Sequence, residues 1–288
     1  MNTRKAPAPV SFARTNALRE VLFPSNTCSN GERKLLEVLF ARFAQDRLRF
    51  SDIFEWSMSG DEQGVDTARF SYAFPAYVHQ RESVARTVIE CVSGFGPAPV
   101  RAAKSVLRAA MDPRVEQILV GYARSSGRNS WRAKFYLQFR DDAGPAALQL
   151  ARAVVGTRRP TQSDDLPLHL LGLDVGSEGL AGAKFYFVHA GEPLAELNWI
   201  GKPRAALRIH RLVHPDDVTF DAPTEIDFAV DGSLWQTLTS APMRAHYERT
   251  CDQFAELGRV FSLRPRRVSV ALGNGRKINV YYALDEVE

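Results

Sequence analysis

Cysteine is scarce in this sequence, and long apolar runs are absent. Only three of the 288 residues are cysteines, namely Cys28, Cys91 and Cys251. Three thiols cannot all pair with one another, and their wide spacing matches no metal-binding motif, so we expect a reducing, cytoplasmic environment. No segment approaches the roughly 18 apolar residues that are needed to cross a bilayer, so we expect no membrane partner.

A strong excess of charge of one sign is also missing. Lysine and arginine number 37, and aspartate and glutamate number 33, which gives a formal net charge of +4. So small a surplus is weak support for binding to nucleic acid, and the basic run at residues 264–267 comes with no recognition motif. We therefore expect no nucleic-acid partner.

The N-terminus carries no recognisable targeting signal. Residues 1–15 contain Arg4, Lys5 and Arg14 but no apolar segment, which predicts a disordered tail and not a signal peptide. Hydrophobic residues make up 45% of the sequence, enough to build a large core without disulfides. No change of composition marks a boundary, so we predict one barrel domain over residues 16–288, acting as a monomer.

Two hydrophobic periodicities alternate along the chain. Apolar residues recur every three or four positions in segments that we predict to be helices, and every second position in predicted strands. Helices are predicted at residues 32–45, 82–92, 100–110, 144–155, 233–238 and 243–261. Strands are predicted at residues 54–59, 67–74, 115–124, 131–140, 168–174, 180–189, 207–214, 225–230, 267–272 and 277–284.

The order of these segments forms a repeat. Helices followed by a strand pair recur about five times, with a period of about 50 residues. About ten antiparallel strands would leave two exposed edges, and closure into a barrel removes both of them. We therefore predict an α+β fold, a single closed antiparallel β-barrel with helices outside and repeated α-α-β-β units. The alternative is an open sheet whose polar face lies in solvent.

The predicted strands are basic and tyrosine-rich on one face and apolar on the other. The triplet Lys-Phe-Tyr occurs at residues 134–136 and again at residues 184–186, each time on the second strand of a hairpin. Successive side chains of a strand point to opposite faces, so the phenylalanines face the helices and the other two side chains face the lumen. The predicted lumen residues are Arg69, Lys134, Lys184, Arg208, Arg267, Lys277, Tyr136, Tyr186 and Tyr281.

Basic side chains above aromatic ones suit the chemistry of an allylic diphosphate. Unpaired buried cations are costly, so such a lumen should hold water and an anionic ligand. Lysine and arginine would bind the diphosphate and stabilise its charge as it leaves. Tyrosine rings below them would stabilise the allyl cation and exclude water. An electron-rich aromatic acceptor, either a small molecule or a peptide side chain, could then capture the cation.

These features resemble those of the ABBA-type aromatic prenyltransferases, whose PT-barrel is built from repeated α-α-β-β units around a site in the lumen. The resemblance covers most of the chain and rests on short motifs. The matching motifs are the Lys-x-Tyr pairs Lys134/Tyr136 and Lys184/Tyr186, and the closing Lys-x-x-x-Tyr-Tyr formed by Lys277, Tyr281 and Tyr282.

The resemblance implies an activity and residue roles. It implies transfer of a dimethylallyl or geranyl group from the diphosphate to an aromatic ring by electrophilic aromatic substitution. It implies diphosphate binding by Arg69, Lys134, Lys184, Arg208 and Lys277, and cation shielding or substrate contact by Tyr136, Tyr186, His210 and Tyr281. In the Phe-Ser-x-x-x-Pro strand at residues 70–75, magnesium-dependent relatives have Asp before the Phe. Arg69 at that position implies that no Mg²⁺, other metal or cofactor is required.

The fourth strand pair departs from the family pattern. Relatives alternate Arg, Lys and Tyr on the first strand of this pair, whereas this chain offers Arg208 and two histidines, His210 and His214. On the second strand, Glu225 and Asp227 are predicted to face the lumen. They either balance the basic side chains or contact the acceptor.

The sequence offers one candidate for a catalytic base. Glu55, on the first strand, is the candidate for taking the proton that is lost when the acceptor ring regains aromaticity, and the alternative is a solvated carboxylate at a sheet edge. A second function also stays open, namely a non-catalytic barrel that binds an anionic or aromatic ligand.

Two further patterns are similar to metal-binding motifs but do not predict metal sites. The acidic segment at residues 216–221 is similar to the magnesium-diphosphate motif of all-helical prenyl synthases, but Pro215 and Pro223 favour a loop in which carboxylates do not converge. His210 and His214 have the spacing of a helical zinc site, but they lie in a segment that alternates like a strand and lacks the zincin glutamate.

Overall fold

A computed structural model shows the fold. It describes residues 18–21, 28–45, 54–62, 64–75, 81–125, 131–161, 163–190, 205–230, 232–256, 261–272 and 277–286. The predicted N-terminal tail lies outside the described residues, as does the predicted turn at residues 273–275. In the described part, no helix is long and apolar enough to cross a membrane.

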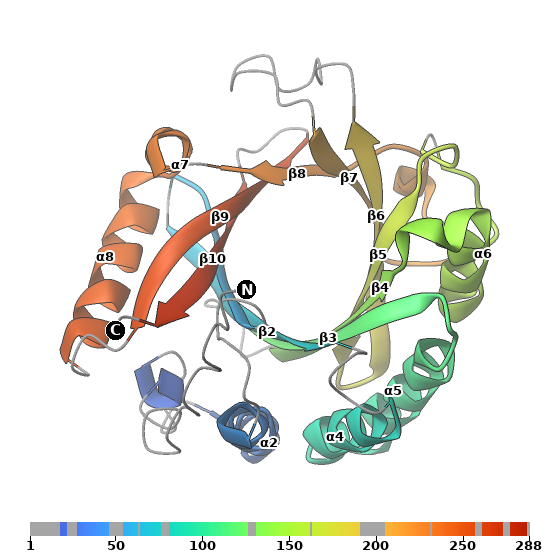
Figure 1. The fold of residues 1–288 in the computed structure, drawn as a ribbon, viewed down its shortest axis with the longest axis horizontal. Helices are drawn as coiled ribbons and strands as arrows, with labels where there is room; N and C mark the ends of the chain where they lie inside the picture. The colour runs from blue at the N-terminus through green and yellow to red at the C-terminus, as the bar shows by residue number, and fades with distance from the viewer. Residues whose placement is uncertain are drawn as a thin grey trace, which may run out of the picture.

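Ten antiparallel strands form one closed barrel, in which each strand pairs with its neighbours in sequence and β1 pairs with β10 (Figure 1). The predicted barrel is therefore confirmed, and the open-sheet alternative is wrong. The strands are β1 (Phe54–Gly60), β2 (Val65–Pro75), β3 (Val115–Ser125), β4 (Trp131–Phe139), β5 (Leu168–Gly176), β6 (Gly179–Ala190), β7 (Ala205–Leu212), β8 (Glu225–Ala229), β9 (Phe261–Ala271) and β10 (Ile278–Glu286).

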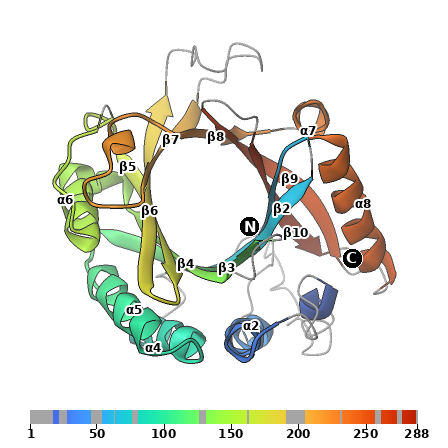
Figure 2. The same ribbon diagram turned by 180° about the vertical axis from the view of Figure 1, so that it is seen from behind.

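The helices lie outside the barrel, as Figure 2 shows from the opposite side. In the described part they precede the first, second, third and fifth strand pairs, which agrees with the predicted repeat. They are α2 (Asn30–Gln45), α4 (Arg81–Ser93), α5 (Pro97–Ala110), α6 (Gly144–Val155), α7 (Gly232–Leu238) and α8 (Ala241–Glu256), with two short 3-10 helices, η2 (Asp141–Ala143) and η4 (Val218–Asp221).

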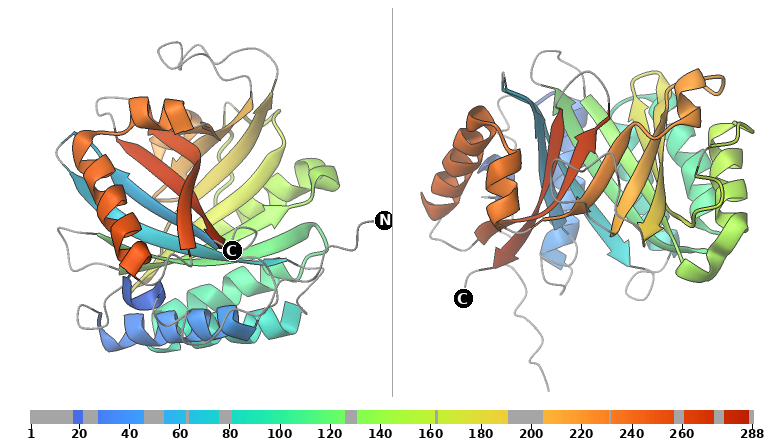
Figure 3. Two further views of the ribbon diagram at one scale, coloured as in Figure 1. Left: turned by 60° about the vertical axis from the view of Figure 1, so that its left-hand side comes forward. Right: turned by 90° about the horizontal axis from the view of Figure 1, so that it is seen from above.

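The hydrophobic core fills the layer between the barrel and its helices, which Figure 3 shows from two further directions. Phe135 and Phe185, the central residues of the two Lys-Phe-Tyr triplets, are fully buried in this layer. Ala147 and Ala151 of α6, one helical turn apart, are also fully buried and belong to the same core. Because the apolar faces are used outside, the polar faces of the strands are left to line the lumen.

The last predicted helix is too long. Its apolar periodicity runs to residue 261, but α8 ends at Glu256 and β9 begins at Phe261. Pro265 lies inside β9. It is tolerated there because the register with β10 shifts beside it, from Tyr281 paired with Arg267 to Tyr282 paired with Pro265. A bulge of this kind accepts a residue that has no N–H to donate to the sheet.

Candidate active site

One cavity inside the barrel is strongly basic, and we name it the basic cavity. It has a volume of about 240 Å³. Six lysines and arginines and two carboxylates line it, together with small and neutral side chains. The lining residues are Ser59, Arg69, Ala123, Arg132, Lys134, Asp174, Lys184, Arg211, Glu225, Ala271, Lys277 and Asn279. Cations converging from several strands in one cavity attract a polyanion.

A second cavity of about 130 Å³, which we name the aromatic cavity, contains three tyrosines. Because Lys134 and Tyr136 are two residues apart on one face of β4, as Lys184 and Tyr186 are on β6, the two cavities adjoin along the strands. The lining residues are Glu55, Ser71, Leu119, Tyr136, Gln138, His169, Leu170, Tyr186, Leu207, Asp227, Arg267 and Tyr281.

Arg69 connects the two cavities. Its guanidinium donates to the Ser57 hydroxyl at 2.8 Å and to the Tyr281 hydroxyl at 3.3 Å. The guanidinium carbon also lies 5.3 Å from the centre of the Tyr281 ring, within the range of a cation–π contact. The strand alternation therefore delivers a cation at the boundary between the basic and aromatic parts of the lumen.

Two of the tyrosines meet over a glycine. The ring centroids of Tyr136 and Tyr186 are 6.5 Å apart, and the ring planes are inclined at 67° in an edge-to-face contact. Between their strands lies Gly172 of β5, whose register partners are Tyr136 on one side and Lys184 on the other. A Cβ atom at Gly172 would lie 2.9 Å from Cε1 of Tyr136 and 3.3 Å from Cε2 of Tyr186. Glycine at this position therefore lets both rings lie against the barrel wall.

Two carboxylates pair with the predicted diphosphate-binding lysines. Lys134 donates to Asp174, its register partner on β5, and Lys184 donates to Glu225 on β8. Burial lowers the pKa of Lys134 to about 8, with Arg69 and Lys184 adding to the effect and Asp174 opposing it. Glu225 therefore balances a basic side chain, which was one of the two alternatives for this residue.

Asp227 likewise balances a basic side chain. It lines the aromatic cavity and accepts a 2.7 Å bond from Nε of Arg267 on the neighbouring strand β9. Both carboxylates of β8 are therefore paired with basic side chains, and contact of Asp227 with an acceptor stays a prediction.

Glu55 also lines the aromatic cavity. Its strand β1 pairs with β2 and with β10, so Glu55 is not at a sheet edge. Burial raises the pKa of Glu55 to about 7, with the cationic Arg267 opposing this rise and Asp227 adding to it. A carboxyl group with such a pKa changes protonation state close to neutral pH, which suits proton transfer.

Solved structures with the same architecture are found by comparison. The 5-dimethylallyl tryptophan synthase from Streptomyces coelicolor, in complex with DMASPP and Trp, superimposes with a TM-score of 0.60 and 16% identity over 96% of this chain and 95% of that chain. The 6-dimethylallyltryptophan synthase from Micromonospora olivasterospora, also with DMASPP and Trp, gives 0.60 and 15% over 95% and 97%. AnaPT from Neosartorya fischeri gives 0.57 and 11% over 96% and 93%.

The chain has the PT-barrel fold of the ABBA-type prenyltransferases. No family model matches the sequence, and no curated protein matches it. At such low identity the likeness concerns the fold, so the chemistry of this PT barrel has to be argued from its own lumen.

Most of the predicted site residues lie in the lumen of the PT barrel. Arg69, Lys134, Lys184 and Lys277 line the basic cavity, and Glu55 and the three tyrosines line the aromatic cavity. The expectation that basic side chains lie beside tyrosines in one lumen agrees with this geometry. The catalytic and binding roles of these residues stay predictions.

Arg208 and His210 do not line the lumen, and their predicted placement is wrong. The lumen side of β7 is instead formed by Leu207 and Ile209, which pack with Tyr186, and by Arg211 in the basic cavity. Alternation then turns Arg208 and His210 outward.

The environment of His210 explains this orientation. Its ring is fully buried, with Nδ1 3.0 Å from the carbonyl oxygen of Phe220 and Nε2 2.9 Å from the hydroxyl of Ser163. Phe220 belongs to η4, which covers the outer face of β7. His210 is thus a hydrogen-bonded core residue, and His214, whose side chain is 75% exposed, lies beyond the strand.

Other lumen residues were not singled out from the sequence. Asp174 could have been predicted from the sequence, because alternation places it on the same face of β5 as Gly172, and it pairs with Lys134. His169 could not, because it is the extra residue of a bulge, which alternation does not reveal. Leu168 pairs with Phe187 and Leu170 with Tyr186, which leaves His169 between them. A bulge re-aims a side chain, and His169 lines the aromatic cavity next to Leu170. Further polar additions include Arg132, Arg211, Ser269 and Asn279.

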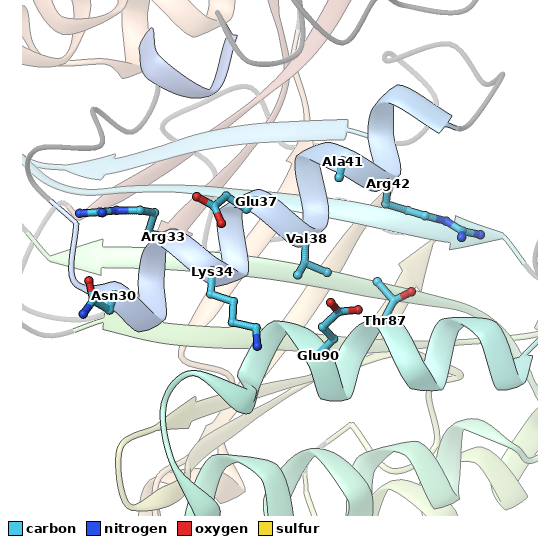
Figure 4. A pocket seen from close by; sticks show the side chains of 9 residues that line it. All are labelled: Asn30, Arg33, Lys34, Glu37, Val38, Ala41, Arg42, Thr87 and Glu90. Atoms are coloured by element: carbon cyan, nitrogen blue, oxygen red, sulfur yellow. The ribbon is translucent and has the colours of Figure 1, made fainter.

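A cavity of about 580 Å³ lies outside the barrel, between α2 and α4 (Figure 4). Basic and acidic side chains alternate along it, among them Arg33, Lys34, Glu37 and Glu90. This mixture favours neither sign of ligand, whereas the basic cavity favours an anion. In the part of the chain that the structure describes, no group of three or more His, Cys, Asp or Glu side chains is placed to hold a metal ion.

Proposed function

We propose that this protein is an aromatic prenyltransferase that moves a dimethylallyl group from an allylic diphosphate to a carbon of a small electron-rich aromatic ring. The observation that carries the proposal is the basic cavity adjoining the aromatic cavity inside one closed barrel. The fold supports it, since two structures with this fold are dimethylallyl tryptophan synthases in complex with DMASPP and Trp.

The basic cavity binds the diphosphate of the donor. Lys134 and Lys184 contact its oxygens from β4 and β6, and Arg69 reaches it from β2. When the bond between the allylic carbon and oxygen breaks, its electron pair leaves with the diphosphate. The cations stabilise that charge more strongly as it develops, which lowers the barrier to ionisation.

The aromatic cavity holds the allyl cation that remains. The ring faces of Tyr136, Tyr186 and Tyr281 attract the cation, and their packing keeps out water, which would convert it to an alcohol. An aromatic carbon of the acceptor attacks, and a carbon–carbon bond forms. The same ring carbon then loses its proton to the carboxylate of Glu55, and the ring regains aromaticity.

The size of the aromatic cavity favours a short donor. Its volume of about 130 Å³ is below the ~300–1,000 Å³ of typical ligand pockets. A five-carbon dimethylallyl group leaves more room for an acceptor ring than a ten-carbon geranyl group does. For the same reason we favour a small aromatic acceptor over the side chain of a folded peptide.

Transfer is proposed to need no divalent metal. Six basic side chains face the diphosphate, and they supply the positive charge that Mg²⁺ supplies elsewhere. The two carboxylates of the basic cavity are engaged by lysines.

The direct test is a mass-spectrometric assay. The protein is incubated with dimethylallyl diphosphate and a panel of phenols, naphthols, indoles and phenazines, with and without EDTA. We expect a product heavier by one dimethylallyl unit, in a yield that EDTA does not change. Thermal stabilisation by the diphosphate without product from any acceptor would instead support a non-catalytic ligand-binding barrel. Product that disappears with EDTA would contradict metal independence.

Substitution of the two lysines tests the site. We expect Lys134→Ala and Lys184→Ala each to raise the KM for the donor roughly 10- to 100-fold, since a charged hydrogen bond contributes ~1.5–3 kcal/mol. Lys104→Ala, on the exposed side of α5, is the matched control and should leave the KM unchanged. Unchanged donor kinetics in both lumen variants would refute the assigned roles.

A further inference from the structure

Asp174 and Glu225, the two carboxylates of the basic cavity, share an unusual arrangement. In each one, a single carboxylate oxygen accepts from a predicted diphosphate-binding lysine. The other oxygen accepts from groups that the sequence did not assign to the diphosphate. The sequence identified the lysines but not this division of the carboxylate oxygens, which depends on how the strands are arranged around the barrel.

Asp174 uses its two oxygens for two different cations. Oδ1 accepts from Nζ of Lys134, and Oδ2 accepts from Nη1 of Arg132 at 3.2 Å. The side chain of Lys134 is 9% exposed, whereas that of Arg132 is 43% exposed. Arg132 thus lies at the rim of the cavity. It can keep Asp174 paired when Lys134 turns toward another anion.

Glu225 follows the same rule with neutral partners. Oε1 accepts from Nζ of Lys184, while Oε2 accepts from the Ser269 hydroxyl at 2.9 Å and from Nδ2 of Asn279 at 3.3 Å. Burial opposes ionisation of Glu225, but Lys184 and Ser269 outweigh it and hold the pKa at about 2. The carboxylate therefore keeps two donors if Lys184 leaves.

Retained partners matter because an unpaired buried charge is costly. Breaking a buried ion pair by removing one partner destabilises a protein by several kcal/mol, since the remaining charge is left without compensation. Here each carboxylate retains a donor after its lysine moves. The lysines can therefore exchange one anion for another without leaving a charge unsatisfied.

We propose that Asp174 and Glu225 are exchangeable counter-ions that occupy Lys134 and Lys184 when the site is empty and compete with the diphosphate for them. They hold the lysines in place before the donor arrives. After transfer, they retake the lysines and so promote release of pyrophosphate. This inference rests on the proposed function only in identifying the basic cavity as the diphosphate site.

The proposal predicts an affinity gain from loss of a polar contact. Asp174→Asn, and separately Glu225→Gln, should bind pyrophosphate more tightly than the unsubstituted protein, by roughly tenfold, which corresponds to ~1.4 kcal/mol. Isothermal titration calorimetry with pyrophosphate at about pH 7 measures this without any acceptor. Asp142→Asn is the matched control, because Asp142 pairs with Arg140 on the surface and should leave the affinity unchanged.

A double-mutant cycle separates exchange from a general change of charge. In a Lys134→Met background, Asp174→Asn should lose most of its tenfold gain, because the lysine for which aspartate and pyrophosphate compete is absent. A full gain in that background would overturn the proposal, and so would weaker binding by both single variants, which would make the carboxylates positioning residues. Circular dichroism identifies any variant that fails to fold. The remaining carboxylate then provides the test, since the two sites are separate.

The pyrophosphate titrations test the counter-ions independently of the transfer assay. Tighter pyrophosphate binding by the variants, with no prenylated product from any acceptor, would support the counter-ions and contradict the proposed enzyme activity. Product formation together with weaker pyrophosphate binding by both variants would support the proposed enzyme activity and contradict the exchange of counter-ions.

Discussion

At the scale of single residues, the lumen depends on side chains whose chemistry changes with burial. Glu55 is the clearest case, because an ordinary glutamate is ionised at neutral pH, whereas burial brings the pKa of this one to about 7. Gly172 is the opposite case. It has no side chain, and its contribution is the space that it leaves for Tyr136 and Tyr186.

The raised pKa of Glu55 predicts the pH dependence of transfer. A base works in its deprotonated form, so kcat should be low well below pH 7, rise through about pH 7 and then level off. Glu55→Gln should lower kcat and remove this rise. The measurement is kcat against pH at saturating donor and acceptor. A profile that keeps the same rise in Glu55→Gln would show that another group, such as His169, takes the proton.

The space at Gly172 predicts an effect on water exclusion. In Gly172→Ala the new methyl group meets Tyr136 and Tyr186, so both rings must move into the aromatic cavity. Overpacking of this kind costs ~1–3 kcal/mol. We expect lower stability and a larger share of donor lost as dimethylallyl alcohol, measured as the ratio of alcohol to prenylated product. Gly176→Ala on the same strand is the control, since its Cβ would lie 3.9 Å from the nearest atom. An equal ratio in both variants would contradict the role of the rings.

At the scale of elements, β7 shows how one strand can reverse its expected faces. Both of its faces carry a cation and aliphatic residues, so alternation alone does not select the face that turns inward. The covering segment η4 selects it, because it buries His210 on the outside. The lumen consequently gains an aliphatic wall from Leu207 and Ile209, with Arg211 at the basic end.

The orientation of β7 predicts opposite effects for two arginines of one strand. Arg211→Ala should weaken donor binding roughly 10-fold, because it removes a cation from the basic cavity. Arg208→Ala should leave donor affinity unchanged and act, if at all, on thermal stability, because the side chain lies outside the lumen. Donor KM and thermal unfolding of both variants check this pair. Weaker donor binding in Arg208→Ala but not in Arg211→Ala would support the orientation predicted from the sequence, in which Arg208 faces the lumen.

At the scale of the whole molecule, the closed barrel forms its lumen from side chains of all its strands. The lining side chains come from all ten strands, and the pairing of β1 with β10 completes the ring. A ligand bound in the centre contacts segments far apart in sequence. It should therefore stabilise the fold as a unit and not one element of it.

Pyrophosphate should accordingly raise the thermal midpoint of the whole chain. At about 100 times the dissociation constant, binding adds ~2.7 kcal/mol to the free energy of unfolding. We expect a single transition shifted upward by several degrees, and a smaller shift at high ionic strength because salt screens the charges. Differential scanning calorimetry with and without pyrophosphate measures both. No shift at low salt would argue against an anion site in the lumen.

The sequence alone determined the features that depend on local pattern. Period-two alternation and turn residues were enough to place all ten strands and to turn Lys134, Tyr136, Lys184 and Tyr186 to one face, because side-chain direction in a strand is set by the backbone of that strand.

Only the tertiary structure decided the features that depend on distant contacts. The register between strands pairs Lys134 with Asp174, a bulge turns His169 inward, and η4 fixes the orientation of β7. Each of these results from packing between segments that lie apart in the chain. Alternation within a single strand contains no information about its neighbours, so it could not have supplied them.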